Sequence, residues 1–79
     1  TRLAGGITLK KGCSIGSHAH EGETEIFLFH AGIGRGEDNG EDKPVGPGDV
    51  VITGGGATHA VANTGEADLV FTAVIVTEA

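Results

Sequence analysis

Closely spaced turn signals, most of them containing glycine, divide this chain into short segments. Glycine makes up 15 of the 79 residues, and no stretch has the apolar spacing of an amphipathic helix. Short segments bounded by such turns are typical of β-strands, and about eight of them favour a sandwich or barrel. We therefore expect an all-β fold, a small antiparallel jelly roll of two sheets. The turn signals are Lys11-Gly12, Glu21-Gly22-Glu23, Asn39-Gly40, Pro47-Gly48, Gly54-Gly55-Gly56 and Thr64-Gly65-Glu66.

Three sequence features give the strongest signals for individual strands. Residues 25–30 form a nearly continuous apolar run, as expected for a strand with both faces covered. Asn39-Gly40 favours a two-residue type I′ turn, which should join a strand near 33–38 to one near 41–45. Residues 69–77 are rich in β-branched side chains and should form the last strand. The other expected strands cover residues 3–10, 13–20, 49–53 and 59–63.

Charge and composition limit the partners of the chain. The formal net charge is −6 and no basic stripe exists, so we expect no nucleic-acid partner. No apolar run reaches membrane-spanning length, so we expect no membrane partner. Cys13 is the single cysteine, which excludes a disulfide within the chain and fits a reducing, cytoplasmic location. A core this small needs support, and a metal or a partner chain would supply it.

We expect residues 1–79 to form one domain. No linker or internal repeat divides the sequence. The first residue is Thr rather than Met, which leaves open a processed or trimmed form without its N-terminal segment.

Two histidines at the end of the expected second strand suggest a metal site. His18 and His20 would share one face of a strand, with Cα atoms about 6.6 Å apart. Imidazoles at that separation can converge on one ion, although the pair alone is a weak signal. If the turn at Gly22 makes an antiparallel hairpin, Glu25 lies opposite the pair. His59 follows a glycine turn far along the chain, and a barrel could bring it to the same point.

The neighbouring acidic residues are weaker candidates. Glu21 and Glu23 fall in the turn, where the backbone should direct them to water. No second carboxylate or histidine is clearly placed inside the barrel to act as a general base.

The spacing of these residues resembles the cupin family. The first cupin motif reads G-x5-H-x-H-x4-E-x6-G, and the second reads G-x5-P-x-G-x2-H-x3-N. The one departure is Gly54, where the family usually has proline, so the turn before His59 should be less stiff. The matching positions are Gly12, His18, His20, Glu25, Gly32, Gly48, Gly56, His59 and Asn63.

The resemblance implies a double-stranded β-helix barrel that holds one divalent metal ion through His18, His20, Glu25 and His59. Three imidazoles and a carboxylate suit Fe, Mn, Ni, Cu, Co or Zn, so the donor set does not select the metal. Cupins commonly pair, so the resemblance also implies a homodimer. Open coordination positions would admit water, oxygen or a small polar molecule.

The activity implied by the resemblance is that of a metal-dependent enzyme. It would act on a small polar molecule in dioxygenase-like cleavage, decarboxylation or isomerisation. The alternative is a non-catalytic module that binds a metal or a small ligand. Cupin oxalate decarboxylases normally have an arginine three residues before the first histidine. This chain has Ile15 there, so a carboxylate clamp of that type is not expected.

Three polar residues outside the candidate ligand set have simpler expected roles. His30 has the opposite strand parity to Glu25 and should point away from the metal. Arg35 should face solvent rather than an anionic substrate. Asn63 should pin a turn. The phenylalanines should fill the core, namely Phe27, Phe29 and Phe71.

Overall fold

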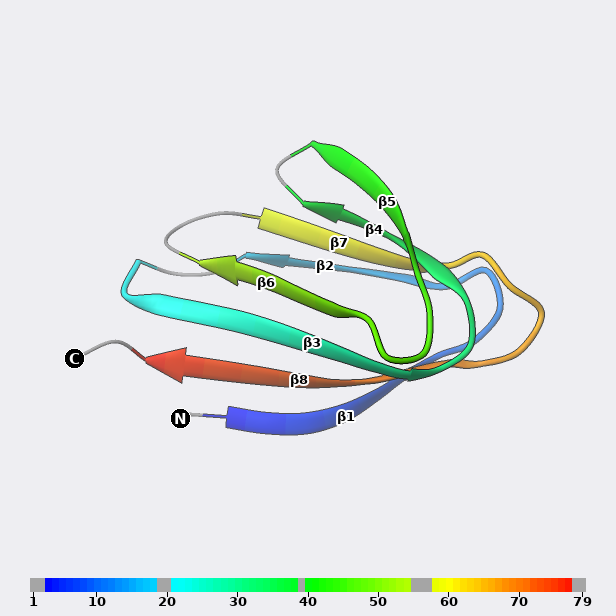
Figure 1. Ribbon diagram of the computed structural model, residues 1–79, viewed down its shortest axis with the longest axis horizontal. Coiled ribbons are helices and arrows are strands. Elements are labelled where there is room, and N and C mark those ends of the chain that lie inside the picture. Colours follow the sequence, from blue (N-terminus) through cyan, green and yellow to red (C-terminus); the bar gives the residue numbers. More distant parts are fainter. Residues whose placement is uncertain (1–2, 19–20, 39, 55–57, 78–79) are drawn as a thin grey trace.

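The computed structural model describes residues 3–18, 21–38, 40–54 and 58–77, which form two four-stranded antiparallel sheets (Figure 1). One sheet has the strand order β1-β8-β3-β6 and the other β2-β7-β4-β5. The expected all-β jelly roll is therefore confirmed. Within the described ranges no helix could cross a membrane. The strands are β1 (Leu3–Leu9), β2 (Ser14–His18), β3 (Glu23–Ala31), β4 (Gly34–Asp38), β5 (Glu41–Val45), β6 (Val50–Gly54), β7 (Thr58–Asn63) and β8 (Leu69–Thr77).

The apolar core lies between the two sheets. Strand β3 alternates buried and more exposed residues, so only one of its faces is covered and the expectation of two covered faces is wrong. Its Phe27 and Phe29 both pack on Phe71 of β8, with ring centroids 4.9 and 5.0 Å apart. The predicted core role of the phenylalanines is confirmed. The buried hydrophobic residues are Leu9, Phe27, Phe29, Val45, Val51, Val61, Leu69 and Phe71.

Turn chemistry matches the sequence at two places where the backbone requires glycine. Gly40 has a φ of 83° and closes the β4–β5 hairpin, in which Asp38 pairs with Glu41. The predicted hairpin at Asn39-Gly40 is confirmed, although Asn39 itself lies outside the described residues. Gly32 has a φ of 89°, and a Cβ there would collide with the backbone carbonyl of Asp68. Only glycine fits a position with both constraints.

The hairpin expected at Gly22 is wrong. Strand β2 pairs with β7, whereas β3 pairs with β6 and β8 in the other sheet. The chain therefore crosses from one sheet to the other between β2 and β3, as Figure 1 shows. A short glycine turn can join two strands of one sheet or carry the chain to the opposite sheet, and the sequence alone did not distinguish the two cases. As a result, Glu25 faces His59 of β7 across the barrel instead of pairing with β2.

Replacing Phe71 should test how much of the stability depends on the aromatic core. Phe71 is fully buried, so Phe71→Ala should lower the free energy of unfolding by about 3–5 kcal/mol. Ile33→Ala is the control, because Ile33 is exposed and should change stability by about 0.5 kcal/mol or less. Urea denaturation followed by circular dichroism measures both. Equal losses in the two variants would contradict this assignment of the core.

Candidate metal centre

Glu25 and His59 meet across the barrel from opposite sheets. Glu25 lies on β3 and His59 on β7, and their side chains are only 8% and 1% exposed. The Nε2 atom of His59 lies 3.5 Å from Oε2 of Glu25. The ring of His59 rests on Phe27, with centroids 4.2 Å apart. A polar pair therefore sits directly against the aromatic core and is shielded from water.

Thr53 holds the other nitrogen of the His59 ring. Its Oγ1 lies 2.5 Å from Nδ1 of His59, and Thr53 is itself buried. Thr53 lies on β6, where it pairs directly with Glu25 of β3. Two neighbouring strands of one sheet thus supply the groups that face both ring nitrogens. Sequence reasoning missed Thr53, because no motif position includes it and its partner lies on a different sheet.

The pair of Glu25 and His59 fits a divalent metal ion. Nε2 of His59 is buried and has no hydrogen-bond partner among the residues that the structure describes. A buried polar nitrogen without a partner is costly, and a bound cation would remove that cost. An ion with bonds of about 2.1 Å to both atoms would hold them roughly 3.0 to 3.4 Å apart. The observed 3.5 Å is close to that separation.

The two other predicted ligands are placed only in part. His18 ends β2 and pairs with Thr58, the residue before His59. Its backbone therefore lies beside the start of β7. His20 lies outside the described residues, and so does the side chain of His18. The residues that are described contain no cluster of three or more possible metal ligands. The four-ligand set thus stays a prediction, of which the structure brings Glu25 and His59 together.

The expectation that Glu23 faces water is wrong. Strand β3 begins at Glu23, two residues earlier than the apolar run suggested, and Glu23 is buried. It shares the inward face with Glu25, because the two residues alternate with Thr24 along the strand. Glu21 is exposed, as predicted. The barrel therefore has a second inward carboxylate, which the sequence analysis did not place there.

Two predictions about polar residues near the site are confirmed. His30 is exposed on the outer face, where its Nε2 lies 2.7 Å from Oγ1 of Thr72. Asn63 is buried, and its Nδ2 donates to the carbonyl oxygens of Leu9 and Ala67. The Oδ1 atom of Asn63 accepts from the backbone N–H of Gly65. Asn63 therefore pins the turn after β7.

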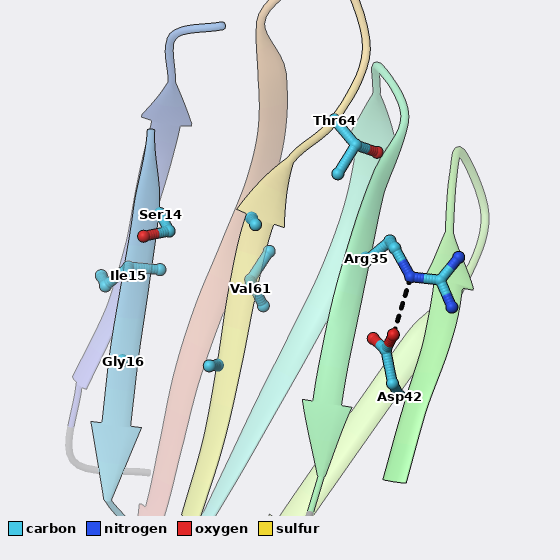
Figure 2. Close-up of a pocket in the computed structure, with 9 residues that line it drawn as sticks. Ser14, Ile15, Gly16, Arg35, Asp42, Val61 and Thr64 are labelled. Carbon is cyan, nitrogen blue, oxygen red and sulfur yellow. Dashed lines mark hydrogen bonds and ion pairs between the residues drawn. The ribbon is translucent and has the colours of Figure 1, made fainter. Parts of the chain in front are cut away.

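A groove of about 490 Å³ lies on the outer face of the sheet formed by β2, β7, β4 and β5 (Figure 2). Its lining includes the small residues Gly16 and Ala62 and the ion pair of Arg35 with Asp42. Nε of Arg35 donates to Oδ2 of Asp42 at 2.9 Å. Arg35 is exposed, whereas its neighbours Gly34 and Gly36 are buried. The prediction that Arg35 faces solvent is confirmed, and Arg35 lies on the outer face of the sheet whose inner face carries His59.

The inner surface of the barrel carries no cationic side chain within the described residues. Ile15 is partly buried and packs against the core, at the position where an arginine clamp was considered. Every lysine and arginine in the described part of the chain is exposed. An anion inside the barrel would therefore need a bound cation for charge neutralisation.

Comparison with known proteins gives matches over almost the whole chain. A family model described as a cupin domain matches residues 6–75. An "Oxalate-binding protein" from Thermotoga maritima is 47% identical over 75 residues, covering 95% of this chain and 62% of that protein. The chain thus spans less than two thirds of the length of this curated relative.

Solved structures agree with the fold. The crystal structure of a predicted oxalate decarboxylase from Thermotoga maritima has a TM-score of 0.91 and 46% identity. The match covers 96% of this chain and 66% of that one. The cupin domain of an XRE family transcriptional regulator from Enterobacter cloacae has a TM-score of 0.86 and 25% identity. That match covers 96% of this chain and 81% of the other.

Proposed function

The chain belongs to the cupin domain family, and on that premise we propose that it holds one divalent transition metal that binds a small chelating acid. The proposed ligands are His18, His20, Glu25 and His59. The observation that carries the proposal is the buried Nε2 of His59, which lies 3.5 Å from Oε2 of Glu25 and has no hydrogen-bond partner in the described part of the chain. Fe, Mn, Ni, Cu, Co and Zn all accept this donor set.

The residues around the site would each perform a defined task. Glu25 would neutralise one charge of the ion, and His59 would contribute a neutral nitrogen. Phe27 covers one side of the His59 ring and excludes water there. When bound, the ion would supply Lewis-acid positions that remain open to oxygen atoms of a ligand.

The proposed ligand class is a small dicarboxylate such as oxalate. A relative that is 47% identical is named an oxalate-binding protein. No cationic side chain faces the interior among the described residues, so the metal itself would have to hold the anion. A ligand with two oxygen atoms positioned for chelation gains from two open coordination positions, whereas a monocarboxylate gains less.

Turnover of the ligand is the second candidate function. Glu23 favours it, because a buried inward carboxylate next to Glu25 on the same face is a group that can accept or donate a proton. Decarboxylation is the reaction suggested by the solved structure with 46% identity, and oxygenase or isomerase chemistry remains within this proposal. A sensing module without turnover is the alternative, as the likeness to a domain of a transcriptional regulator suggests.

The proposal includes a homodimer in the cytoplasm. Leu28, Val50 and Ile52 are exposed, and they share the outer face of the sheet that contains β3 and β6. A second copy seated there would cover apolar surface and add to a small core. The exposed lone Cys13 fits a reducing compartment.

Metal content should separate His59 from His30. Tag-free wild-type protein should contain close to one equivalent of a transition metal by plasma mass spectrometry, and His59→Ala should lose most of it. His30→Ala is the matched control and should keep the metal, since His30 lies on the outer face. A metal-free wild type after reconstitution, or loss of metal in His30→Ala, would contradict the proposed site.

Oxalate should bind only to the metal-containing protein. Isothermal titration calorimetry of the reconstituted and the metal-free protein measures this, with acetate as the monocarboxylate control. Equal binding with and without metal would refute the metal as the anchor. Formate release from bound oxalate would establish turnover, and binding without any product would leave the chain a binding module.

Glu23 should strengthen metal binding through its charge. Residues two apart on one strand face have Cα atoms about 6.6 Å apart. An ion bound to Glu25 would then lie about 8 Å from the Glu23 carboxylate, and even in water this attraction is about 1 kcal/mol, or about fivefold in affinity. Glu23→Gln should therefore raise the Kd for Co²⁺ about fivefold, while Glu21→Gln, on an exposed turn, should not. Equal Kd values for the two variants would show that Glu23 does not act on the ion.

A further inference from the structure

The hydroxyl of Thr53 and the His59 ring form a buried contact that no cupin motif position explains. Oγ1 of Thr53 lies 2.5 Å from Nδ1 of His59, and both residues are buried. The ring cannot swing freely, because Phe27 lies against it with centroids 4.2 Å apart. Thr53 also pairs with Glu25 across β3 and β6. Strands β3 and β6 therefore position both Glu25, a candidate metal ligand, and Thr53, which contacts the second candidate ligand, His59.

The direction of this hydrogen bond determines what His59 can bind. A neutral imidazole carries one proton, which resides on either Nδ1 or Nε2. If the hydroxyl donates to Nδ1, the proton is on Nε2 and points at Glu25. If Nδ1 donates to the hydroxyl, Nε2 carries a lone pair that faces Oε2 of Glu25 at 3.5 Å. In that tautomer both atoms can bind the same cation, which an Nε2-protonated ring cannot do.

We propose that Thr53 is a positioning residue whose hydroxyl accepts the Nδ1 proton of His59 and so keeps Nε2 unprotonated and directed at the metal. The inference rests on the proposed metal function and adds a residue to it. Metal-binding histidines generally donate their other ring N–H to a fixed acceptor, and loss of that acceptor typically weakens metal binding 10- to 100-fold. In this chain the hydroxyl of Thr53 would be that acceptor. Because Thr53 pairs with Glu25, the strand pairing also fixes the position of this acceptor relative to the ligand on β3.

The chain offers a conservative variant and a matched control. Thr53→Val keeps the shape of the side chain and removes the hydroxyl, whereas Thr53→Ser keeps the hydroxyl. Thr72 provides the control, because its Oγ1 lies 2.7 Å from Nε2 of His30 on the outer face. Thr72→Val breaks a threonine–histidine contact of the same kind away from the site.

The test combines Co²⁺ affinity with the ring tautomer of the metal-free protein. We expect Thr53→Val to raise the Kd for Co²⁺ by about 10- to 100-fold. Thr53→Ser should bind nearly as well as wild type, and Thr72→Val should bind equally well. Nitrogen-15 NMR should show His59 of the metal-free wild type protonated at Nδ1, and in Thr53→Val protonated substantially at Nε2.

Separate outcomes contradict the inference and the function on which it rests. Wild-type affinity in Thr53→Val, or an Nε2-protonated His59 in the wild type, would overturn the role of Thr53. Failure of the wild type to bind Co²⁺ would overturn the metal function, and the tautomer would then decide the role of Thr53 alone. If Thr53→Val does not fold, the wild-type tautomer and Thr53→Ser affinity still test the inference, because loss of affinity in Thr53→Ser would contradict it.

Discussion

The burial of Glu25 against His59 is the interaction on which the rest of this account depends. Each residue comes from a different sheet, and both are shielded from water. An imidazole nitrogen is costly to bury without a hydrogen bond, and the described residues leave Nε2 of His59 without a hydrogen-bond partner. A divalent cation bound to both Nε2 of His59 and Oε2 of Glu25 would remove this cost and stabilise the folded protein. The two sheets would then be joined by coordination as well as by the aromatic core.

Strand β3 contributes to both the proposed site and the aromatic core, because every second side chain of a β-strand lies on the same face. Glu23, Glu25, Phe27 and Phe29 all face inward along β3, since alternate side chains lie on the same face. The polar half of the strand lines the proposed site, and its aromatic half packs on Phe71. A shift of one residue in the register of β3 would exchange both sets for outward-facing residues. The fold and the proposed chemistry therefore constrain each other.

Sequence reasoning predicted the features that depend on local chemistry. The hairpin at Gly40, the outward position of His30 and the turn held by Asn63 follow from turn propensity, strand parity and side-chain hydrogen bonding, and the structure confirms all three. The meeting of Glu25 with His59 was expected from motif spacing and from a barrel closing on itself, and the structure brings the two together.

Features that depend on which strands pair were harder to predict. A short turn can join two strands within a sheet or carry the chain to the opposite sheet, so the turn at Gly22 gave the wrong pairing. Glu23 was placed in solvent because its strand begins before the apolar run. Thr53 could not be found from sequence, because its role depends on a contact between β6 of one sheet and β7 of the other.

Anomalous X-ray diffraction from crystals of the Co²⁺-reconstituted protein tests the central claim most directly. The account predicts one strong anomalous peak within bonding distance of Nε2 of His59 and an Oε atom of Glu25, with Nδ1 of His59 still against the hydroxyl of Thr53. Co²⁺ found only elsewhere, for example beside His30 on the outer face, would contradict it. So would a direct hydrogen bond between His59 and Glu25 with no peak between them.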